Sequence, residues 1–381
     1  MSAVYLDHAA TSPLHPKVLE AMNNAERKFF GNPSSIHRFG REARRQLEEA
    51  RAAIAESIGA NESEIIFTSG GTEAANLAII GTALRRKHEG RHIVTTAIEH
   101  HAVLNSCKFL KTLGFEVTYA PVQQNGVVLA SDIVNALRDD TILVSVMFGN
   151  NEIGTLQPIS EIGQALQETD ALFHTDAVQA FGMMRFDVKK LHVDLLSVSA
   201  HKINGPKGTG FLFAKEGVNV SPLMHGGEQE KKRRAGTENV AGIVGMHTAI
   251  QLSQASLDER RAQYESFRKK MLAIFEQHDL SFVVNGGDAD VLPHILNVSF
   301  PDAKADALLA SLDLAGVAAS SGSACTAGTL QPSHVLQAMF KDDEKRVESA
   351  IRFSFGLGNT MADIEKAAYE TVQSVKRITG R

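Results

Sequence analysis

The stretch 64-EIIFTSGGTEAANLAIIGTALRRKHEGRHIVTTA-97 holds one copy of the pattern that decides the fold. A short apolar run at 64–69 is followed by a glycine-rich turn, an amphipathic segment at 73–88 and a second apolar run at 92–97. Short runs rich in Val and Ile are typical of buried strands, while the longer segment has the length and polarity of a helix. The stretch therefore predicts a strand, a helix and a second strand.

The same pattern continues outward from this stretch. Strands separated by helices favour a mostly parallel sheet that helices cover on both faces, so the expected fold class is α/β. A further helix is expected at 101–114. Further strands are expected at 116-EVTYAP-121, 141-TILVSVMF-148, 171-ALFHTD-176, 194-DLLSVSA-200 and 209-TGFLFA-214.

The pattern of expected helices and strands changes near residue 255. A chain of 381 residues exceeds the size at which one hydrophobic core usually stops growing, so two domains are expected. We predict a large domain at 15–255 and a smaller α+β domain at 256–381 that also takes in 1–14. The elements expected in the smaller domain are a helix at 256–278, a strand at 295–300, a helix near 304–314, a strand at 350–355 and a helix from about 360.

Composition and charge exclude several classes of protein. Hydrophobic residues make up 43% and charged residues 22%, which is typical of a globular chain and unlike a disordered or fibrous one. The net charge of −5 gives no general attraction to nucleic acid or to anionic membranes. No stretch has the roughly 20 apolar residues of a membrane span, and the N-terminus lacks the features of a signal peptide. We therefore expect a cytoplasmic protein without membrane or direct nucleic acid contacts.

Ligands of open α/β sheets bind in the loops that follow the carboxyl ends of the strands, so these loops are the places to search. The loop 69-SGGTEAAN-76 offers backbone N–H groups at the start of a helix, which suits an anion such as phosphate, although a plain helix cap at Thr72 is the alternative. In 98-IEHH-101 the histidines are candidates for stacking on a flat cofactor or for the surface. Metal binding is the least favoured interpretation, because no set of ligands surrounds them.

Three further loops carry polar residues of the same kind. The asparagines of 149-GNNEIGT-155 are turn formers or donors to an oxygen-bearing ligand. Asp176 is a helix cap or the acidic partner of a pyridinium nitrogen. Lys202, at the mouth of a strand, is a candidate for a Schiff base, whereas Lys207 lies further on in a turn. Together these residues fit one cofactor, pyridoxal phosphate.

The chain has two cysteines, which by themselves exclude a disulfide scaffold, a four-thiolate iron–sulfur cluster and a Cys₄ zinc site. Cys107 lies among Leu and Phe residues and is expected to be a buried, inert thiol. Cys325 lies in 319-ASSGSACTAGTLQPSHVL-336, where small residues predict an exposed loop. It is either a reactive thiol or an incidental surface cysteine.

These motifs resemble those of the group I cysteine desulfurases, the NifS/IscS type, within the fold-type-I pyridoxal-phosphate enzymes. The resemblance covers nearly the whole chain, and the pairing of SGSAC with a downstream IRFSFG is its most specific part. The segments that carry it are 5-YLDHAAT-11, 31-GNPSSIH-37, 68-TSGGTEAAN-76, 99-EHHAVL-104, 149-GNNEIG-154, 174-HTDAVQ-179, 199-SAHKINGPKGTG-210, 226-GGEQEKKRRAGTEN-239, 320-SSGSACTAG-328 and 351-IRFSFG-356.

The resemblance implies a task for each candidate residue. Lys202 forms the Schiff base with the cofactor and removes the Cα proton of the substrate. Cys325 accepts the sulfur of L-cysteine as a persulfide, while L-alanine is the other product. His100 stacks on the cofactor ring and exchanges a proton with the thiol. The remaining residues bind the ring (Asn151, Asp176, Gln179), the phosphate (Gly71, Thr72, Ser199, His201, and Thr237 of a neighbouring subunit) or the substrate (Arg352, Asn151).

The resemblance also implies partners. A homodimer follows from the role of Thr237, and a protein sulfur acceptor, either an iron–sulfur scaffold or a tRNA thiolase, follows from the persulfide. Two positions depart from other members, His8 in place of Asn and Ala200 in place of Gly, but neither removes a required group. The basic run in 230-EKKRRAGTEN-239 is a solvated loop or a docking surface. Alternatives to the whole assignment are a selenocysteine lyase, an aminotransferase and a non-catalytic protein on this fold.

Overall fold

The computed structural model describes residues 3–321, 325–326, 329–330 and 332–380, and of residues 325, 326, 329 and 330 it describes the backbone alone. A seven-stranded sheet lies at the centre of this described part, in the order β2-β8-β7-β6-β5-β3-β4. Its strands are β2 (Ile65–Thr68), β3 (His92–Thr96), β4 (Glu116–Ala120), β5 (Thr141–Ser145), β6 (Leu172–Asp176), β7 (Leu195–Ser199) and β8 (Gly210–Ala214). All seven were predicted from the sequence.

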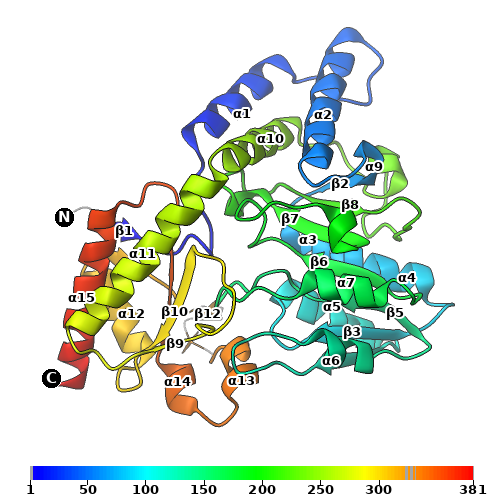
Figure 1. The fold of residues 1–381 in the computed structure, drawn as a ribbon. Coiled ribbons are helices and arrows are strands. Elements are labelled where there is room, and N and C mark those ends of the chain that lie inside the picture. Colours follow the sequence, from blue (N-terminus) through cyan, green and yellow to red (C-terminus); the bar gives the residue numbers. More distant parts are fainter. Residues whose placement is uncertain (1–2, 322–324, 327–328, 331, 381) are drawn as a thin grey trace.

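The sheet is mostly parallel, as predicted, because helices connect most of its consecutive strands. Strands β7, β6, β5, β3 and β4 pair in parallel, and β8 is antiparallel to both β7 and β2. Helices cover both faces (Figure 1). The connecting helices are α3 (Gly71–Asn76), α4 (Thr82–Arg86), α5 (His101–Thr112), α6 (Ala130–Asn135), α7 (Ile159–Leu166) and α8 (Val188–Leu191).

Alternating residues of the strands divide the core between the two faces of the sheet. Ile66, Ile93 and Leu195 belong to one hydrophobic cluster, which includes residues of α3 and α5. Their neighbours Phe67, Val94 and Leu196 belong to a second cluster on the other face. This period of two is what a strand buried on both sides requires.

The predicted helix at 73–88 has an irregular centre. The chain is helical from α3 to α4, with the π-helical segment Leu77–Gly81 between them. Gly81 lies where a Cβ would meet the carbonyl oxygen of Ser221 at 2.8 Å, so the close approach of the loop after β8 requires glycine here. A single extra residue in a helical turn of this kind is often found near functional sites.

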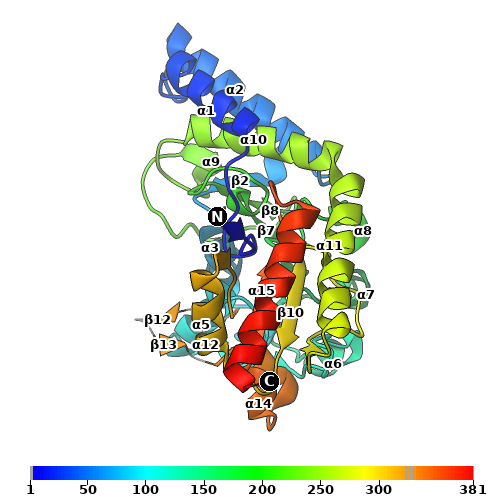
Figure 2. The same cartoon turned by 90° about the vertical axis from the view of Figure 1, so that its left-hand side faces the viewer.

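The C-terminal part forms a second, smaller layer of structure. Strands β14 (Ala350–Ser354), β10 (Ile295–Ser299) and β9 (Val283–Val284) pair antiparallel, and helix α15 (Met361–Thr379) packs against α11 (Leu257–Gln277) and α12 (Ala305–Leu314), as Figure 2 shows. The N-terminal strand β1 (Val4–Tyr5) pairs with β11 (Val317–Ala318). Two short helices, α13 (His334–Phe340) and α14 (Glu344–Glu348), precede β14.

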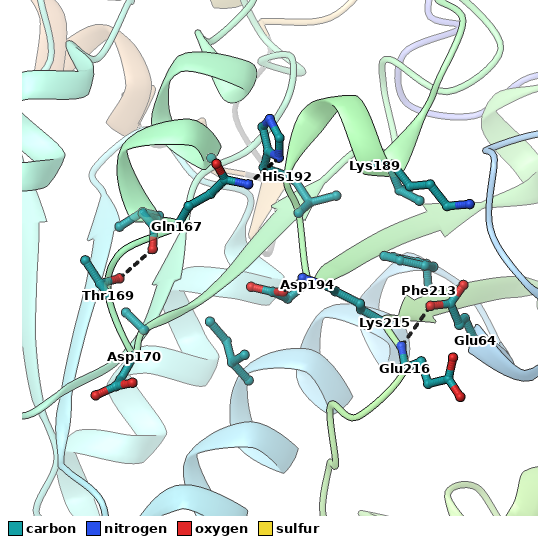
Figure 3. A pocket seen from close by; sticks show the side chains of 16 residues that line it. Glu64, Gln167, Thr169, Asp170, Lys189, His192, Asp194, Phe213, Lys215 and Glu216 are labelled. Atoms are coloured by element: carbon teal, nitrogen blue, oxygen red, sulfur yellow. Dashed lines mark hydrogen bonds and ion pairs between the residues drawn. The ribbon is translucent and has the colours of Figure 1, made fainter.

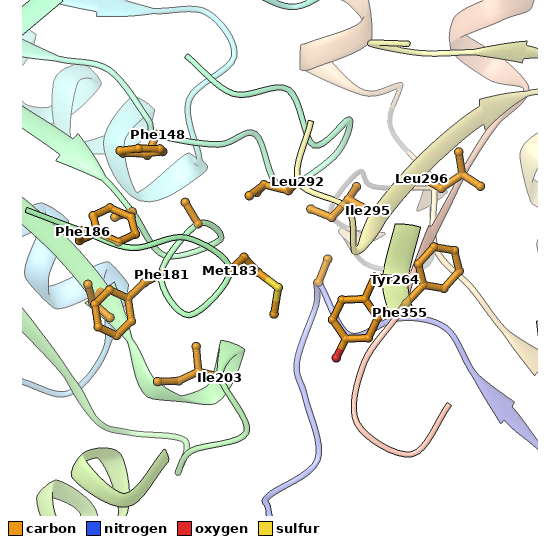
Figure 4. Close-up of a cluster of buried hydrophobic side chains, with 14 of the residues drawn as sticks. Phe148, Phe181, Met183, Phe186, Ile203, Tyr264, Leu292, Ile295, Leu296 and Phe355 are labelled. Atoms are coloured by element: carbon orange, nitrogen blue, oxygen red, sulfur yellow. The ribbon is translucent and has the colours of Figure 1, made fainter. Parts of the chain in front are cut away.

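Helices α1 (Pro16–Lys28), α2 (Arg38–Glu56) and α10 (Val240–Ala255) pack together at one end of the molecule, and α9 (Gln229–Lys232) lies in the loop before α10. The helical backbone is interrupted at Ser256, which ends α10 and begins α11. Side chains from the sheet loops, such as Met183, lie beside C-terminal residues such as Leu292 and Ile295 in one continuous cluster (Figure 4). The domain boundary near residue 255 stays a prediction.

The segment predicted as a Gly/Ser-rich loop contains a short hairpin. Its strands are β12 (Cys325–Thr326) and β13 (Thr329–Leu330), which pair antiparallel. The side chain of Cys325 lies outside the described part of the structure. No helix of the described residues is long and apolar enough to cross a membrane.

Candidate active site

A cavity of about 380 Å³ lies at the carboxyl ends of β3, β5, β6 and β7. This is the edge of the sheet where a ligand is expected. Every predicted site residue whose side chain is described lines this cavity, except Thr237. The lining residues are Ala9, Ala10, Gly71, Thr72, His100, His101, Met147, Gly149, Asn151, Glu152, Asp176, Val178, Gln179, Ser199, His201, Lys202, Ser320, His334 and Arg352.

Lys202 lies in the 3-10 turn Ala200–Lys202 that follows β7. Its Nζ donates to the carbonyl oxygens of Ala9 at 2.5 Å and Ala10 at 2.7 Å. Burial, and then the nearby charge of Arg352, lower its pKa to about 8 from 10.5. Much of the amine is therefore neutral near pH 8, and a neutral amine is the form that attacks a carbonyl group.

Asp176 ends β6 on the floor of the cavity and is buried. Its Oδ1 accepts a hydrogen bond from the backbone N–H of Val178 at 2.9 Å. Burial raises the pKa of this carboxyl to about 6. A buried carboxylate of this kind is stabilised by a positive group in the cavity, such as a protonated ring nitrogen.

Gly70 and Gly71 start the helix that follows β2. Gly70 has φ 142° and ψ −175°, a region that only glycine adopts readily. A Cβ on Gly71 would lie 2.7 Å from the side chain of Val178, so this position also requires glycine. Ser199 lies beside both glycines. Backbone N–H groups and a hydroxyl therefore meet at one corner of the cavity, an arrangement that suits the predicted phosphate.

His100 caps the N-terminus of α5, where its Nδ1 accepts a hydrogen bond from the N–H of Ala102 at 3.1 Å. Its ring faces the open cavity, yet desolvation and the charge of Lys202 lower its pKa to about 4. A neutral, flat ring at this place suits stacking on an aromatic cofactor. Within the described residues, no group of three or more His, Cys, Asp or Glu side chains is placed to hold a metal ion.

The two asparagines of the loop after β5 have different surroundings. Asn150 is buried, and its Oδ1 accepts from the N–H groups of Glu152 at 2.8 Å and Ile153 at 3.0 Å, which closes the turn. Asn151 lines the cavity, and its Oδ1 has no hydrogen-bond partner in the described part of the chain. The turn-former interpretation thus applies to Asn150, and the role of Asn151 as a donor to a ligand stays a prediction.

Arg352 on β14 points into the cavity from the C-terminal layer. Its guanidinium donates to the carbonyl oxygen of Asn151 at 2.9 Å and to Oδ1 of Asp7 at 2.7 Å. Its Nε is buried and has no partner among the described residues. An unpaired N–H of a guanidinium beside an accessible cavity is a site for a carboxylate.

Other predicted residues have mixed outcomes. Gln179 donates to the carbonyl oxygen of Ala9 at 2.9 Å, and the ring of His201 contacts Thr11 Oγ1 at 3.1 Å. Thr237 is exposed in the loop between α9 and α10 and does not line the cavity. Two residues that line the cavity but had no predicted role are Ala9 and the buried Glu152. They lie within the motifs 5-YLDHAAT-11 and 149-GNNEIG-154.

Both arginines of the basic run in 230–239 bind other groups of the same chain. Arg233 donates to the carbonyl oxygen of Ser63 at 3.0 Å, and Arg234 pairs with Glu73 at 2.8 Å. Lys231 and Lys232 are exposed. The run therefore offers only part of its charge to a docking partner.

A second cavity of about 520 Å³ lies at the opposite edge of the sheet, near the start of β6 and β7 (Figure 3). Its polar side chains pair with one another, as Gln167 does with His192 at 2.8 Å and Lys215 with Asp194 at 3.0 Å. None of the predicted site residues with a described side chain lines it. Because ligands of this fold bind at the carboxyl ends of the strands, the cavity lined by Lys202 is the candidate active site.

Comparisons with known proteins agree with this geometry. The family model of class-V aminotransferases matches residues 4–367. The chain is also 60% identical to the "Putative cysteine desulfurase IscS 1" of Bacillus subtilis, over 100% of both chains. The chain belongs to the class-V aminotransferase family, among its NifS/IscS-type cysteine desulfurases. The family and the fold class predicted from the sequence are thereby confirmed.

Solved structures of two similar proteins have the same fold. A "NIFS-LIKE PROTEIN" matches with a TM-score of 0.91 and 36% identity, over 97% of this chain and 98% of that one. A structure described as "SspA in complex with cysteine" matches with a TM-score of 0.81 and 36% identity, over 92% of this chain and 98% of that one. The class-V aminotransferase family depends on pyridoxal phosphate.

Proposed function

We propose that this class-V chain is a cysteine desulfurase that converts L-cysteine to L-alanine and carries the sulfur as a persulfide on Cys325. The convergence of Lys202, Asp176 and Arg352 on one cavity is the observation that carries the proposal. These residues supply an amine of lowered pKa, a buried acid and a carboxylate-binding guanidinium. One cavity thus holds the groups that an amino-acid reaction of this type needs.

The residues of the cavity fit pyridoxal phosphate. Gly71, Thr72, Ser199 and His201 would hold its phosphate, with Thr237 of a second subunit. Asp176 would hold its protonated ring nitrogen, Asn151 and Gln179 its ring oxygen, and His100 its ring face. The unpaired Oδ1 of Asn151 and the raised pKa of Asp176 are two features that a bound cofactor would satisfy. When bound, the cofactor supplies the electron sink that lets the substrate Cα lose its proton.

The chain's own residues perform the remaining tasks. Arg352 binds the α-carboxylate of L-cysteine with its free Nε and the adjoining Nη2, in place of part of its contact with Asp7. The amine of Lys202 takes up the Cα proton. The structure described as "SspA in complex with cysteine" supports L-cysteine as the substrate, since that protein shares the fold over most of its length.

Cys325 completes the reaction as a nucleophile. Its thiolate attacks the sulfur of the substrate, an S–S bond forms, and the bond from the substrate Cβ to sulfur breaks. The electron pair of that bond stays with the carbon skeleton, which takes up protons and leaves as alanine. His100 is the proposed proton partner of the thiol, and its pKa of about 4 keeps the ring neutral at pH 7.

The pKa of Lys202 predicts how cofactor attachment depends on pH. At pH 7.5 a pKa of about 8 leaves roughly a quarter of the amine neutral, against about one part in a thousand for an ordinary lysine at 10.5. The rate at which the cofactor-free protein develops its absorbance with pyridoxal phosphate should therefore rise with pH and level off above about 8.5. A small lysine analogue under the same conditions should keep accelerating to pH 10. The same late rise for the protein would contradict the lowered pKa.

Substitution of Arg352 by lysine should weaken cysteine binding. Loss of a two-point contact to a carboxylate costs about 2 kcal/mol or more, which corresponds to about 30-fold weaker binding. The measurement is the cysteine concentration that half-saturates the absorbance change of the bound cofactor. Cysteamine, which lacks the carboxylate, is the matched control and should bind the two proteins alike. Equal weakening of both ligands would show that Arg352 acts on the cofactor or the fold instead.

Product analysis tests the proposed reaction as a whole. The holoenzyme with L-cysteine and a thiol reductant should release alanine and sulfide in equal amounts. Pyruvate in place of alanine would indicate an elimination reaction, and a keto acid formed with amino transfer would indicate an aminotransferase. Radiolabelled sulfur on Cys325 would then identify the protein acceptor. A homodimer, a cytoplasmic location and an acceptor for iron–sulfur assembly or tRNA thiolation remain part of this proposal.

A further inference from the structure

The chain on both sides of residues 322–331 contacts residues that line the active-site cavity. On the N-terminal side, the backbone of Ser320 pairs with the backbone of Arg352, the proposed carboxylate-binding residue. On the C-terminal side, Ser333 and His334 begin helix α13. The contacts of these two residues therefore determine where the chain returns from the Cys325 segment.

Glu152 contacts both Ser333 and His334 at the start of α13. Its side chain is 2% exposed, and Oε2 accepts a hydrogen bond from the hydroxyl of Ser333. Its Oε1 lies 3.8 Å from Nδ1 of His334. Burial raises the pKa of Glu152, while the hydrogen bond from Ser333 and the electrostatic influence of His334 and Arg352 oppose that rise.

His334 is oriented by a second contact. Its Nε2 donates to the carbonyl oxygen of Glu99 at 2.9 Å, which leaves Nδ1 as the ring atom that faces Glu152. Its ring also lies against His101, with the ring centroids 4.7 Å apart. Two hydrogen bonds and a ring contact thus fix the first residues of α13.

Glu152 itself is held rigidly. Its N–H donates to the side chain of Asn150, and its carbonyl oxygen accepts from Asn297 at 3.1 Å. It follows Asn151 directly, and the carbonyl oxygen of Asn151 binds Arg352. The loop that contains Asn151 and Glu152 therefore contacts both Arg352, the proposed carboxylate-binding residue, and Ser333 at the start of α13.

We propose that Glu152 is a positioning residue that sets the reach of the Cys325 thiol by fixing Ser333 and His334 beside the substrate site. The proposal rests on the proposed function, in which Cys325 attacks the substrate sulfur. Glu152 touches neither substrate nor thiol in this role. Its loss should slow sulfur transfer while cysteine binding, which depends on Arg352 and the cofactor, is retained.

The test separates these two steps in single-turnover experiments on the holoenzyme. Cysteine binding is followed by the absorbance change of the bound cofactor, and persulfide formation by transfer of radiolabelled sulfur to the protein. For Glu152→Ala we expect binding within about threefold of wild type and persulfide formation about 100-fold slower, the cost of a misplaced reacting group. Glu152→Gln keeps an acceptor for Ser333, so it should recover most of the rate.

Ser333→Ala supplies an independent variant if Glu152→Ala does not fold. Because Ser333 also caps α13 by accepting the N–H of Leu336 at 3.1 Å, the matched control is Asp343→Ala, which removes the cap of the neighbouring helix α14. Ser333→Ala should slow persulfide formation at least about tenfold, and Asp343→Ala should not. Equal slowing by both variants, or equal loss of binding and transfer, would overturn the role of Glu152. Sulfide release by a Cys325→Ser enzyme would instead overturn the proposed function.

Discussion

Replacement of Lys202 by alanine should abolish desulfurase activity, with a loss of at least about 10³-fold. The variant loses both the amine that attaches the cofactor and the base that takes up the Cα proton. Its cavity also loses the positive group that donates to the carbonyl oxygens of Ala9 and Ala10. The purified protein should lack the visible absorbance of the bound cofactor and yield no adduct on borohydride reduction.

Lys207→Ala is the matched control for this experiment. Lys207 is exposed and lies five residues after Lys202 in the same sequence motif, but it does not line the cavity. Its variant should keep full absorbance, a reducible adduct and wild-type activity. Should the Lys202→Ala protein retain a reducible adduct while Lys207→Ala loses it, the assignment of the attachment site would be wrong.

Replacement of Cys325 by serine should stop sulfur transfer while the cofactor stays bound. A hydroxyl is not ionised near neutral pH and is a far weaker nucleophile than a thiolate, so sulfide release should fall at least about 10³-fold. The absorbance of the bound cofactor and its change on addition of cysteine should persist, because Lys202, Asp176 and Arg352 are unaltered. This separation of binding from transfer distinguishes a desulfurase from other enzymes of the fold.

Cys107→Ala is the control for Cys325→Ser. Cys107 is fully buried in α5, and burial raises the pKa of its thiol to about 12, so no thiolate forms there near neutral pH. Labelled sulfur should appear on the Cys107→Ala protein as on wild type. Undiminished sulfide release from Cys325→Ser would exclude the persulfide mechanism, whichever residue held the cofactor.

Much of the cavity could be predicted from the sequence because its residues follow strands directly. In a parallel sheet the carboxyl ends of all strands meet at one edge, so the local positions of His100, Asp176 and Lys202 already imply that they converge. The resemblance to cysteine desulfurases added Arg352 and Cys325, which no strand-end argument reaches. Strand positions were predictable for a related reason, since a short run of Val, Ile and Leu is a local signal of a strand buried on both faces.

Other features needed the tertiary structure. The sequence presents Asn150 and Asn151 as equals, yet only burial of the first and exposure of the second to the cavity give them different roles. The sequence motif around Glu152 likewise does not indicate Ser333 as its partner, 181 residues away. Such pairings depend on how loops pack against each other and leave no periodic signal in the chain.

Composition and periodicity alone therefore determined the mostly parallel sheet, its strands and the presence of Lys202 and Asp176 at the strand ends, because these follow from local pattern and from one rule of sheet geometry. The tertiary structure alone decided which charges face one another. It brings Asp7 to Arg352, 345 residues away in the sequence. It also brings the carbonyl oxygens of Ala9 and Ala10 within hydrogen-bond distance of Lys202. Electrostatic contacts act over a few ångströms in space without regard to sequence distance, so only the folded chain reveals them.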